Sequence, residues 1–512
     1  MVAPVTRAAN SSTCPTDRPS ATHGSLAGAE PGRNGPHPAG GTLARMHLHD
    51  RETEVLTQAV VRYAIDRMRL DPPPLDRPHT PAELRAMAGG TVTPQGIGGL
   101  EALRVFGDVF APACISIDHP KFLSFVPAAP TEASMLFDLV VGASSVYAGS
   151  WLEGGGAIFA ENEALRWIAD LAGLPDSSGG VFVSGGTAGN LSALIAARWR
   201  WRHRAAGAHD RTRGLMIAST GAHSSVAQAA RAMDADVVTV PAGERGRLSG
   251  EALRSTVAAL HPDDRDRLFA VVATAGTTNV GVIDDLDGAA DVAEEYHTWF
   301  HVDGAYGGAA LAAPSVRELF TGVERADSFI VDPHKWLFAP FDSCALLYRE
   351  PEIGRAAHTQ HAEYLDVLHT DDPAVEPWNA SDYAHHLSRR ARGLPLWFSL
   401  ATHGTDAYVD AVEVTLDVAR EAARLVDATA HTELVMEPEL SVVLFRRVGW
   451  TKADYQAWSD RELYEGRAFV VPTSWRGETV LRFCIVNPRT SIGDIGDILA
   501  TLAEPAHAGD AS

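Results

Sequence analysis

The chain has 512 residues, and 43 Lys and Arg stand against 65 Asp and Glu, so its formal net charge at pH 7 is −22. This excess of negative charge argues against nucleic acids and anionic membranes as partners, because both attract basic surfaces. No apolar run reaches the roughly 18 residues that a membrane-spanning helix requires. The four cysteines form no CxxC pair and no metal-ligand spacing, which favours reduced thiols, no metal site and a cytoplasmic protein.

The composition changes along the chain and predicts four parts. The first 45 residues are rich in Pro, Gly, Ser, Ala and Thr and lack an apolar signal core, as is typical of disordered tails. Apolar residues then recur at helical spacing over 46–70, which predicts a helix of an N-terminal arm. The expected parts are a disordered tail at 1–45, a helical arm at 46–125, a large α/β domain at 126–400 and a small C-terminal domain at 401–512.

Strands and helices alternate from Gly180 onward, which is the pattern of a mostly parallel α/β sheet. In such sheets ligands bind at the carboxyl ends of the strands, and several polar clusters follow predicted strands directly. The expected strands cover residues 181–183, 215–218, 237–240, 268–274, 299–303, 329–331 and 345–348. The small domain is expected to hold helices at 407–428 and 495–502 and strands at 441–445 and 478–486.

One stretch, SFIVDPHKWLFAPFDSCALLY at 328–348, contains Lys335, which is one of only three lysines in the chain. Arginine supplies nearly all other cations, so a lysine in this apolar, aromatic setting suggests that a primary amine is needed. Such an amine can condense with an aldehyde, and partial desolvation is expected to lower its pKa and free the neutral nucleophile. The alternative is a lysine at a strand end whose ammonium group reaches solvent.

Two further clusters are compatible with ligand binding but also with structural roles. The sequence SGGTAGN at 184–190 joins a strand to a helix, where glycines let a ligand approach the backbone and the helix N-terminus favours an anion. A tight turn would have the same composition. His223, in GAHSS, can stack on a ring, donate to a carboxylate or shuttle a proton, but it can equally cap a helix.

Two strand ends complete the set. Thr274, in ATAGTT, ends one predicted strand, where its hydroxyl could serve a ligand or the backbone. Asp303, in HVDGAYGG, ends a buried strand, and its carboxylate needs a partner such as a protonated ring nitrogen or an arginine.

The clusters together fit one ligand, pyridoxal phosphate, which is an aromatic aldehyde with a phosphate and a basic ring nitrogen. The turn at 185–187 would hold the phosphate, and His223 would cover one face of the ring. Asp303 would keep the ring nitrogen protonated, while Lys335 would hold the aldehyde as an imine.

With these residues assembled, the sequence resembles the group II pyridoxal-phosphate decarboxylases, which include the aromatic-L-amino-acid and glutamate decarboxylases. The likeness runs from about His119 to Leu400 and rests on SGGTAGN, AHSSV, ATAGTT, HVDGAYGG, ADSFIVDPHKW and SRRARGLPLW. It implies the fold of fold-type I enzymes: a large, mostly parallel α/β domain, an N-terminal helical arm and a small C-terminal α+β domain. It also implies a homodimer with active sites at the subunit interface.

The resemblance assigns roles to individual residues. Lys335 is implied as the imine lysine, Asp303 as the partner of the pyridinium nitrogen and His223 as the ring-stacking residue. Tyr364, in AEYLDV, resembles a tyrosine on a mobile loop that protonates the carbanion left by CO2 loss and closes over the neighbouring subunit's site. The expected cofactor-binding residues are Gly185, Gly186, Thr187, His223, Thr274, Asp303, Ala305, His334 and Lys335.

The expected substrate pocket departs from the pattern of the aromatic-amino-acid decarboxylases. Ile117 and Gly149 stand where those enzymes carry large aromatic side chains, whereas Phe125 and Pro127 keep the pocket apolar. Arg389, first in SRRAR, matches a family position near the site and could help to hold an anion. The substrate therefore stays open.

A second departure is Asp332, at a position where several members of the family have Asn beside the phosphate. A carboxylate there would repel the phosphate unless it were turned away or paired.

The resulting expectation is decarboxylation of an L-amino acid to a primary amine and CO2, in which the amino acid displaces Lys335 and Tyr364 protonates Cα. The alternatives are an oxidative decarboxylase-deaminase that uses O2 and forms an aldehyde, an aminotransferase, and a non-catalytic homologue. Oxidative members tend to lose the loop tyrosine or the stacking histidine, and this chain has both Tyr364 and His223.

Overall fold

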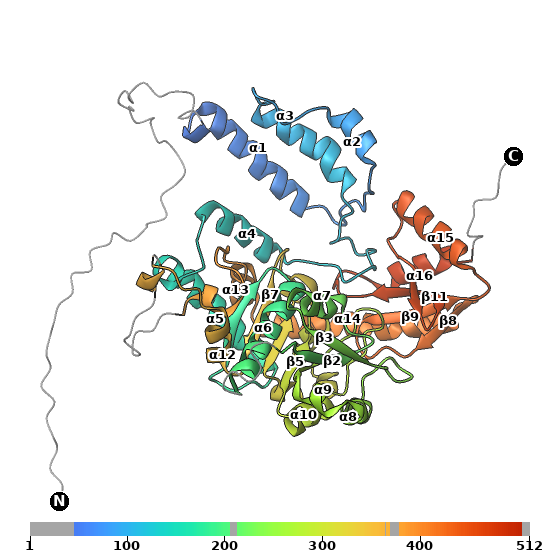
Figure 1. The fold of residues 1–512 in the computed structure, drawn as a ribbon. Helices are drawn as coiled ribbons and strands as arrows, with labels where there is room; N and C mark the ends of the chain where they lie inside the picture. The colour runs from blue at the N-terminus through green and yellow to red at the C-terminus, as the bar shows by residue number, and fades with distance from the viewer. Residues whose placement is uncertain (1–45, 205–211, 364, 369–377, 504–512) are drawn as a thin grey trace, which may run out of the picture. The chain divides into compact units, whose positions relative to one another are not determined.

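The computed structural model describes residues 46–204, 212–363, 365–368 and 378–503 (Figure 1). The chain divides into two units, Met1–Ala59 and Val60–Ser512, and the boundary lies within helix α1 (Arg51–Met68). The predicted tail at 1–45 lies outside the described residues. Two short helices, α2 (Pro81–Ala88) and α3 (Gly99–Val105), follow α1, and the assignment of this region as an arm stays a prediction.

A seven-stranded sheet forms the centre of the second unit, with the order β1-β7-β6-β5-β4-β2-β3. Its inner strands are mostly apolar because both faces of the sheet are covered, and every residue of β4 and β5 is buried. The strands are β1 (Gly179–Val183), β2 (Leu215–Ser219), β3 (Asp236–Val240), β4 (Leu268–Thr274), β5 (Trp299–Asp303), β6 (Ser328–Val331) and β7 (Cys344–Tyr348).

The directions of the strands bring the carboxyl ends of β1 to β6 to one edge of the sheet. Strands β2, β4, β5 and β6 pair in parallel. Strand β7 runs antiparallel to both β6 and β1, so β1 has the same direction as β6. The polar clusters that follow β1, β2, β4, β5 and β6 therefore meet at this edge, and the predicted mostly parallel sheet is confirmed.

Helices cover both faces of this sheet, as the alternation of side chains along β1 shows. Phe182 packs into one apolar core, whereas its neighbours Val181 and Val183 pack into another on the opposite face. The helices of this part are α4 (Glu132–Ser144), α5 (Trp151–Leu171), α6 (Gly186–Arg204), α7 (Ser224–Ala232), α8 (Gly250–Ala259), α9 (Pro262–Asp266), α10 (Leu286–Glu295), α11 (Pro333–Trp336), α12 (Pro351–His358) and α13 (Leu394–His403).

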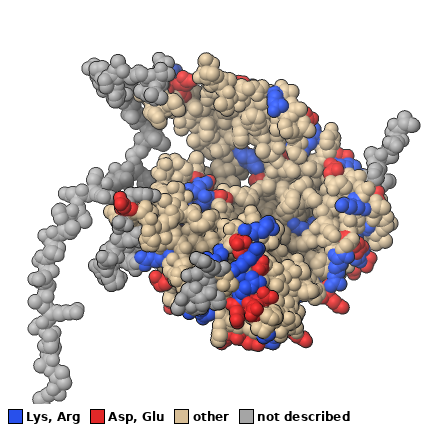
Figure 2. All heavy atoms as spheres, in the orientation of Figure 1, with Lys and Arg blue, Asp and Glu red and all other residues tan. Residues whose placement is uncertain are grey.

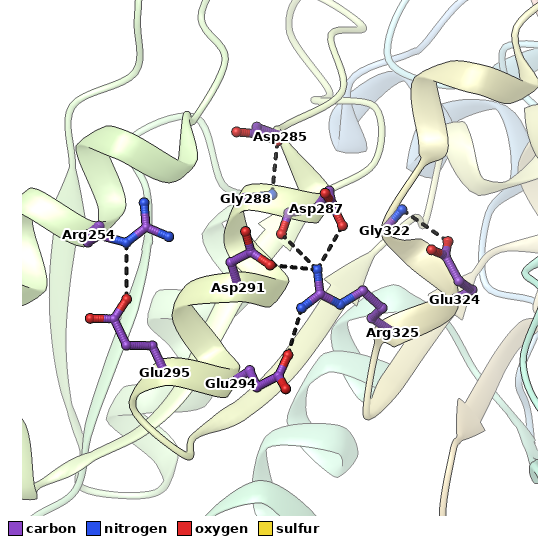
Figure 3. Close-up of polar contacts among 10 residues, drawn as sticks. All are labelled: Arg254, Asp285, Asp287, Gly288, Asp291, Glu294, Glu295, Gly322, Glu324 and Arg325. Carbon is purple, nitrogen blue, oxygen red and sulfur yellow. Dashed lines mark hydrogen bonds and ion pairs between the residues drawn. The ribbon is translucent and has the colours of Figure 1, made fainter.

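An ion-pair cluster fixes α10 to the short 3₁₀ helix η6 (Val323–Arg325). The Arg325 guanidinium lies 2.7 Å from Asp287, 2.8 Å from Asp291 and 2.8 Å from Glu294 (Figure 3). The three acids lie on one face of α10, because residues spaced by three or four positions are neighbours on a helix. Arg325 thus relieves their mutual repulsion. Elsewhere on the surface, acidic and basic side chains also lie side by side (Figure 2).

The C-terminal elements, drawn in orange and red in Figure 1, form a smaller antiparallel sheet with the order β10-β11-β9-β8. This sheet and its helices have their own apolar core, which includes Phe445, Trp458 and Phe483. None of the described helices is long and apolar enough to cross a membrane. The elements are α14 (Thr405–Ala428), β8 (Thr432–Met436), β9 (Val442–Arg447), α15 (Lys452–Tyr464), β10 (Thr473–Trp475), β11 (Glu478–Cys484) and α16 (Ile492–Thr501).

Candidate active site

A cavity of about 400 Å³ opens at the carboxyl edge of the large sheet. Its wall is made from the segments that follow β1, β2, β4, β5 and β6, as expected for a parallel sheet. The structure brings together the whole predicted cofactor set on this wall: Gly185, Gly186, Thr187, His223, Thr274, Asp303, Ala305, His334 and Lys335.

The glycine turn after β1 leads directly into α6, whose first residue is Gly186. A Cβ atom at this position would lie 3.1 Å from Ala305 Cβ and 3.2 Å from Asp332 Oδ2, so the close approach favours glycine. The first N–H groups of a helix have no acceptor within the helix and attract an anion. This end of the cavity therefore fits a phosphate group.

Asp303 lies at the end of β5 and is only 3% exposed. Its Oδ2 accepts a hydrogen bond from Asn190 Nδ2 at 2.8 Å, and its Oδ1 accepts one from the Ala305 N–H at 3.1 Å. A carboxylate has about four lone-pair positions, so a further donor can be accommodated. A protonated ring nitrogen in the cavity would be such a donor.

His223 caps a helix and also lines the cavity, and its stacking on a ring stays a prediction. It is the N-cap of α7, where its Nδ1 accepts a hydrogen bond from the Ser225 N–H at 3.2 Å. Its ring also lines the cavity. Helix capping therefore fixes the ring in a position from which it can cover a bound aromatic ligand.

Lys335 lies on the short helix α11, and its Nζ is 2.9 Å from Asp332 Oδ2. Burial lowers the pKa of Lys335, but the Asp332 carboxylate and, to a smaller extent, other groups raise it. The upward contributions outweigh the effect of burial, so the pKa of Lys335 lies above its ordinary value. The lowered pKa expected from desolvation alone is therefore wrong for the structure without cofactor. The Asp332 carboxylate, which was expected to repel a phosphate unless it were turned away or paired, is buried and forms an ion pair with Lys335.

Thr274 places a hydroxyl-bearing side chain on the cavity wall. Its Oγ1 is buried and has no hydrogen-bond partner among the described residues, although the side chain lines the cavity. Buried hydroxyl groups are normally satisfied, so a ligand atom in the cavity is the natural partner. Together with the glycine turn, the acceptor Asp303 and the amine of Lys335, this hydroxyl fits pyridoxal phosphate. Among the described residues, no cluster of His, Cys, Asp or Glu could hold a metal ion.

A family model described as the pyridoxal-dependent decarboxylase conserved domain matches residues 101–448. The chain belongs to this family. It is thus a pyridoxal-phosphate-dependent carboxy-lyase that acts on an amino acid, and pyridoxal phosphate is its cofactor.

Curated relatives agree with this assignment. The decarboxylase is 30% identical over 397 residues to the aromatic-L-amino-acid decarboxylase of Bacillus atrophaeus, covering 75% of this chain and 80% of the relative. It is 31% identical over 423 residues to the L-2,4-diaminobutyrate decarboxylase of Rhizobium meliloti (strain 1021), covering 80% and 83%.

Solved structures share the fold of this decarboxylase. The Oryza sativa TDC crystal structure with PLP and tryptamine superposes with a TM-score of 0.79 at 24% identity, covering 92% of this chain and 98% of that chain. The crystal structure of mouse CSAD gives a TM-score of 0.80 at 24% identity, covering 88% and 98%.

The residues predicted for the substrate pocket do not line this cavity. Ile117 lines a separate cavity of about 600 Å³, beside Phe106. At Gly149 a Cβ atom would lie 2.8 Å from a backbone oxygen, so this glycine is a close packing point. Phe125 is 61% exposed, and Pro127 is buried. Their contribution to substrate binding stays a prediction.

Arg389 is engaged within the protein. Its guanidinium forms two hydrogen bonds to the Glu161 carboxylate, at 2.7 and 2.8 Å, and both side chains are buried. It also donates to the Ala148 carbonyl at 2.7 Å. Its role toward an anionic ligand stays a prediction, as does the proton-donor role of Tyr364, which lies outside the described residues.

The cavity wall of the decarboxylase also contains residues that were not predicted from the sequence, among them Phe341 and Asn190. Phe341 packs on the His334 ring, with ring centroids 4.6 Å apart, and lines the cavity. Asn190 lies on the buried face of α6 that also carries Ala193, Leu194 and Ala197. A polar residue in an otherwise apolar helical stripe requires a buried partner, and this was the signal that could have identified Asn190.

Proposed function

We propose that this decarboxylase converts an L-amino acid into its primary amine and CO2 without net oxidation. The observation that carries the proposal is the arrangement of Lys335, Asp303 and His223 around one cavity beside the glycine turn at the start of α6.

Different residues of the cavity hold different parts of the cofactor. The N–H groups at the start of α6 bind the phosphate, Asp303 holds the proton on the ring nitrogen, and Lys335 provides the amine that carries the aldehyde. When bound, pyridoxal phosphate withdraws electrons from the bond between Cα and the carboxylate of the substrate.

The remaining roles concern the substrate itself. His223 covers the ring face and orients the substrate carboxylate, so that the bond to be broken is aligned for electron withdrawal. We assign the proton delivered to Cα after CO2 loss to the hydroxyl of Tyr364. A Tyr364→Phe variant should therefore bind the cofactor normally but lose amine output and release more aldehyde. An unchanged amine output would remove Tyr364 from this role.

The substrate belongs to the L-α-amino acids, and the relatives suggest which classes to assay. Curated relatives are named as decarboxylases of aromatic L-amino acids and of L-2,4-diaminobutyrate, whose side chains carry an aromatic ring and an amino group. The test is a panel of aromatic, acidic, branched and basic L-amino acids, with CO2 and amine measured together. Stoichiometric amine and CO2 support the proposal. Aldehyde with ammonia and hydrogen peroxide, at the expense of O2, would identify the oxidative reaction instead.

We further propose that the enzyme is a homodimer whose sites combine residues of both subunits. Large apolar side chains lie exposed on α4 and α5, where Leu136, Leu139, Leu152 and Phe159 are 42%, 50%, 69% and 59% exposed. An exposed apolar surface of this kind is typical of a subunit interface.

Subunit complementation tests this arrangement. Co-expressed Lys335→Ala and Tyr364→Phe chains should yield amine, because one site of each mixed dimer has Lys335 and the partner subunit's Tyr364. The matched control pairs Lys335→Ala with Asp303→Ala, which both belong to one subunit's cavity wall and should not complement. Equal amine output in the two mixtures would contradict the shared site.

A further inference from the structure

Asn190 lies near the start of α6 and forms hydrogen bonds to both Asp303 and Ser225. Ser225 in turn contacts His223. Asn190 is 1% exposed, and its Nδ2 donates to Asp303 Oδ2 at 2.8 Å and to Ser225 Oγ at 2.8 Å. Both hydrogens of the Asn190 amide are therefore used. One is donated to Asp303, the proposed partner of the cofactor's ring nitrogen, and the other to Ser225, which contacts His223.

The orientation of this amide is fixed by its other neighbour, His301. Burial lowers the pKa of His301 to about 4, so the ring is neutral and carries one proton. His301 Nε2 lies 2.8 Å from Asn190 Oδ1, which accepts that proton's hydrogen bond. The other ring nitrogen, His301 Nδ1, then accepts a hydrogen bond from the Ser328 hydroxyl at 2.8 Å. Ser328 Oγ itself accepts one from Trp299 Nε1 at 2.7 Å. Each donor has one acceptor, so flipping the amide would break the whole chain of hydrogen bonds.

The same chain of hydrogen bonds, together with the backbone N–H of Ser225, favours one position for the proton of the His223 ring. Because Ser225 Oγ accepts from Asn190, its own hydrogen is directed to His223 Nδ1, 2.8 Å away. The Ser225 N–H donates to the same nitrogen at 3.2 Å. A nitrogen that accepts from two donors cannot itself carry a proton, so the neutral ring has its proton on Nε2.

We propose that Asn190 is a positioning residue that orients the Asp303 carboxylate and, through Ser225, holds the His223 proton on Nε2. His223 then presents a hydrogen-bond donor from Nε2 and not a base. The part that concerns the ring nitrogen rests on the proposed function, whereas the location of the His223 proton does not.

Three variants separate this role from a purely structural one. Ser225→Ala removes the branch to His223 and leaves Asp303 untouched, while Asn190→Leu removes both branches at similar volume. Ser192→Ala is the matched control, because Ser192 is buried on the same helix but contacts His385 Nδ1, at 2.9 Å, and does not line the cavity.

The first readout is the ¹⁵N spectrum of histidine-labelled full-length protein, recorded with and without pyridoxal phosphate, with the His223 signals identified by their loss in His223→Gln. The wild type and Ser192→Ala should show the single Nε2–H form of His223. In Ser225→Ala the hydroxyl is absent, and in Asn190→Leu it is free to rotate, so the backbone N–H of residue 225 is the one fixed donor left to Nδ1, and a share of the Nδ1–H tautomer should appear. A single Nε2–H form in both variants would overturn the proposal.

The second readout is the affinity for pyridoxal phosphate and the pH titration of its absorbance when bound. Loss of a hydrogen bond to a charged group should weaken cofactor binding roughly tenfold in Asn190→Leu and shift the titration, whereas Ser225→Ala should bind as the wild type does. Wild-type binding and titration in Asn190→Leu would overturn the proposal. Should Asn190→Leu not fold, Asn190→Ala replaces it with the same expectations.

The two readouts also separate this inference from the proposed function. A wild-type chain that binds no pyridoxal phosphate would contradict the proposed function, while the ¹⁵N spectrum of the cofactor-free chain would still decide where His223 carries its proton.

Discussion

At the scale of single residues, the reactivity of Lys335 depends on Asp332, three positions before it. The carboxylate is 2% exposed and lies 2.9 Å from Lys335 Nζ. Burial raises the pKa of Asp332, but the nearby Lys335 and His334 lower it by more than burial raises it. The pKa therefore lies below its ordinary value, and the carboxyl group is ionised. The amine that must attack the cofactor aldehyde is thus held as an ammonium ion in the cofactor-free enzyme.

The first prediction concerns the rate at which cofactor-free enzyme takes up pyridoxal phosphate. In Asp332→Asn the counter-ion of Lys335 is lost, so the pKa of the amine falls and more of it is neutral at a given pH. The pH profile of the loading rate, followed by the absorbance of bound cofactor, should therefore move to lower pH than in the wild type. A profile that is unchanged or moves to higher pH would show that Asp332 does not control the amine.

The sequence located Lys335, Asp303 and His223 because their polar clusters come at or just after the ends of predicted strands and together fit one ligand. It did not predict the raised pKa of Lys335, because desolvation was weighed without the contact to Asp332. The contact depends on how the chain turns between β6 and α11, and one-dimensional spacing does not specify that geometry.

At the scale of elements, the large sheet was predictable because its strands are short apolar runs separated by helices. The expected strand at 268–274 coincides with β4, and the expected helix at 407–428 differs from α14 by two residues at its start. Strands β8 and β10 and helix α15 were missed. Strand β10 has three residues and β8 is only partly buried, so neither has a continuous apolar run.

The second prediction concerns the contact between α10 and η6. In Arg325→Met three carboxylates lose their shared cation, so the free energy of unfolding should fall by about 1 kcal/mol after allowance for solvent screening. The loss should be larger at low salt, as measured by urea unfolding.

Arg254→Met is the matched control for that measurement, because Arg254 pairs with a single acid of α10, Glu295, at 3.0 Å (Figure 3). One exposed pair contributes little, so its loss should change the unfolding free energy less than the loss of Arg325. An equal effect of the two variants would contradict the view that the three-acid cluster acts as a unit.

At the scale of the whole molecule, buried neutral histidines link stability to pH. Burial is the main cause that lowers the pKa of His301 and His358 to about 4 and that of His386 to about 3, from an ordinary value of 6.5. The unfolded chain therefore binds protons that the folded chain does not between pH 6.5 and about 4. Their contribution to stability is fully present above pH 6.5 and is lost as the pH falls toward 4.

The third prediction is a loss of about 1 kcal/mol of unfolding free energy per histidine for each pH unit below the ordinary histidine pKa. Urea unfolding of the cofactor-free enzyme on either side of that value measures it. His358→Gln should flatten the dependence, since glutamine does not titrate and can still donate to the Ser192 carbonyl, which His358 Nε2 contacts at 3.0 Å. An unfolding free energy that does not change below the ordinary histidine pKa would contradict the view that these histidines are buried and neutral. The same holds if its dependence on pH is as steep in His358→Gln as in the wild type.

The central claim is that the amine of Lys335 carries the cofactor, and the chain offers an unusually direct test because it has only two other lysines, Lys121 and Lys452. Borohydride reduction of the enzyme loaded with pyridoxal phosphate, followed by peptide mass spectrometry, locates the modified amine. We predict a phosphopyridoxyl group on Lys335 alone. Modification of Lys121 or Lys452 in its place, or an unmodified Lys335, would contradict the account.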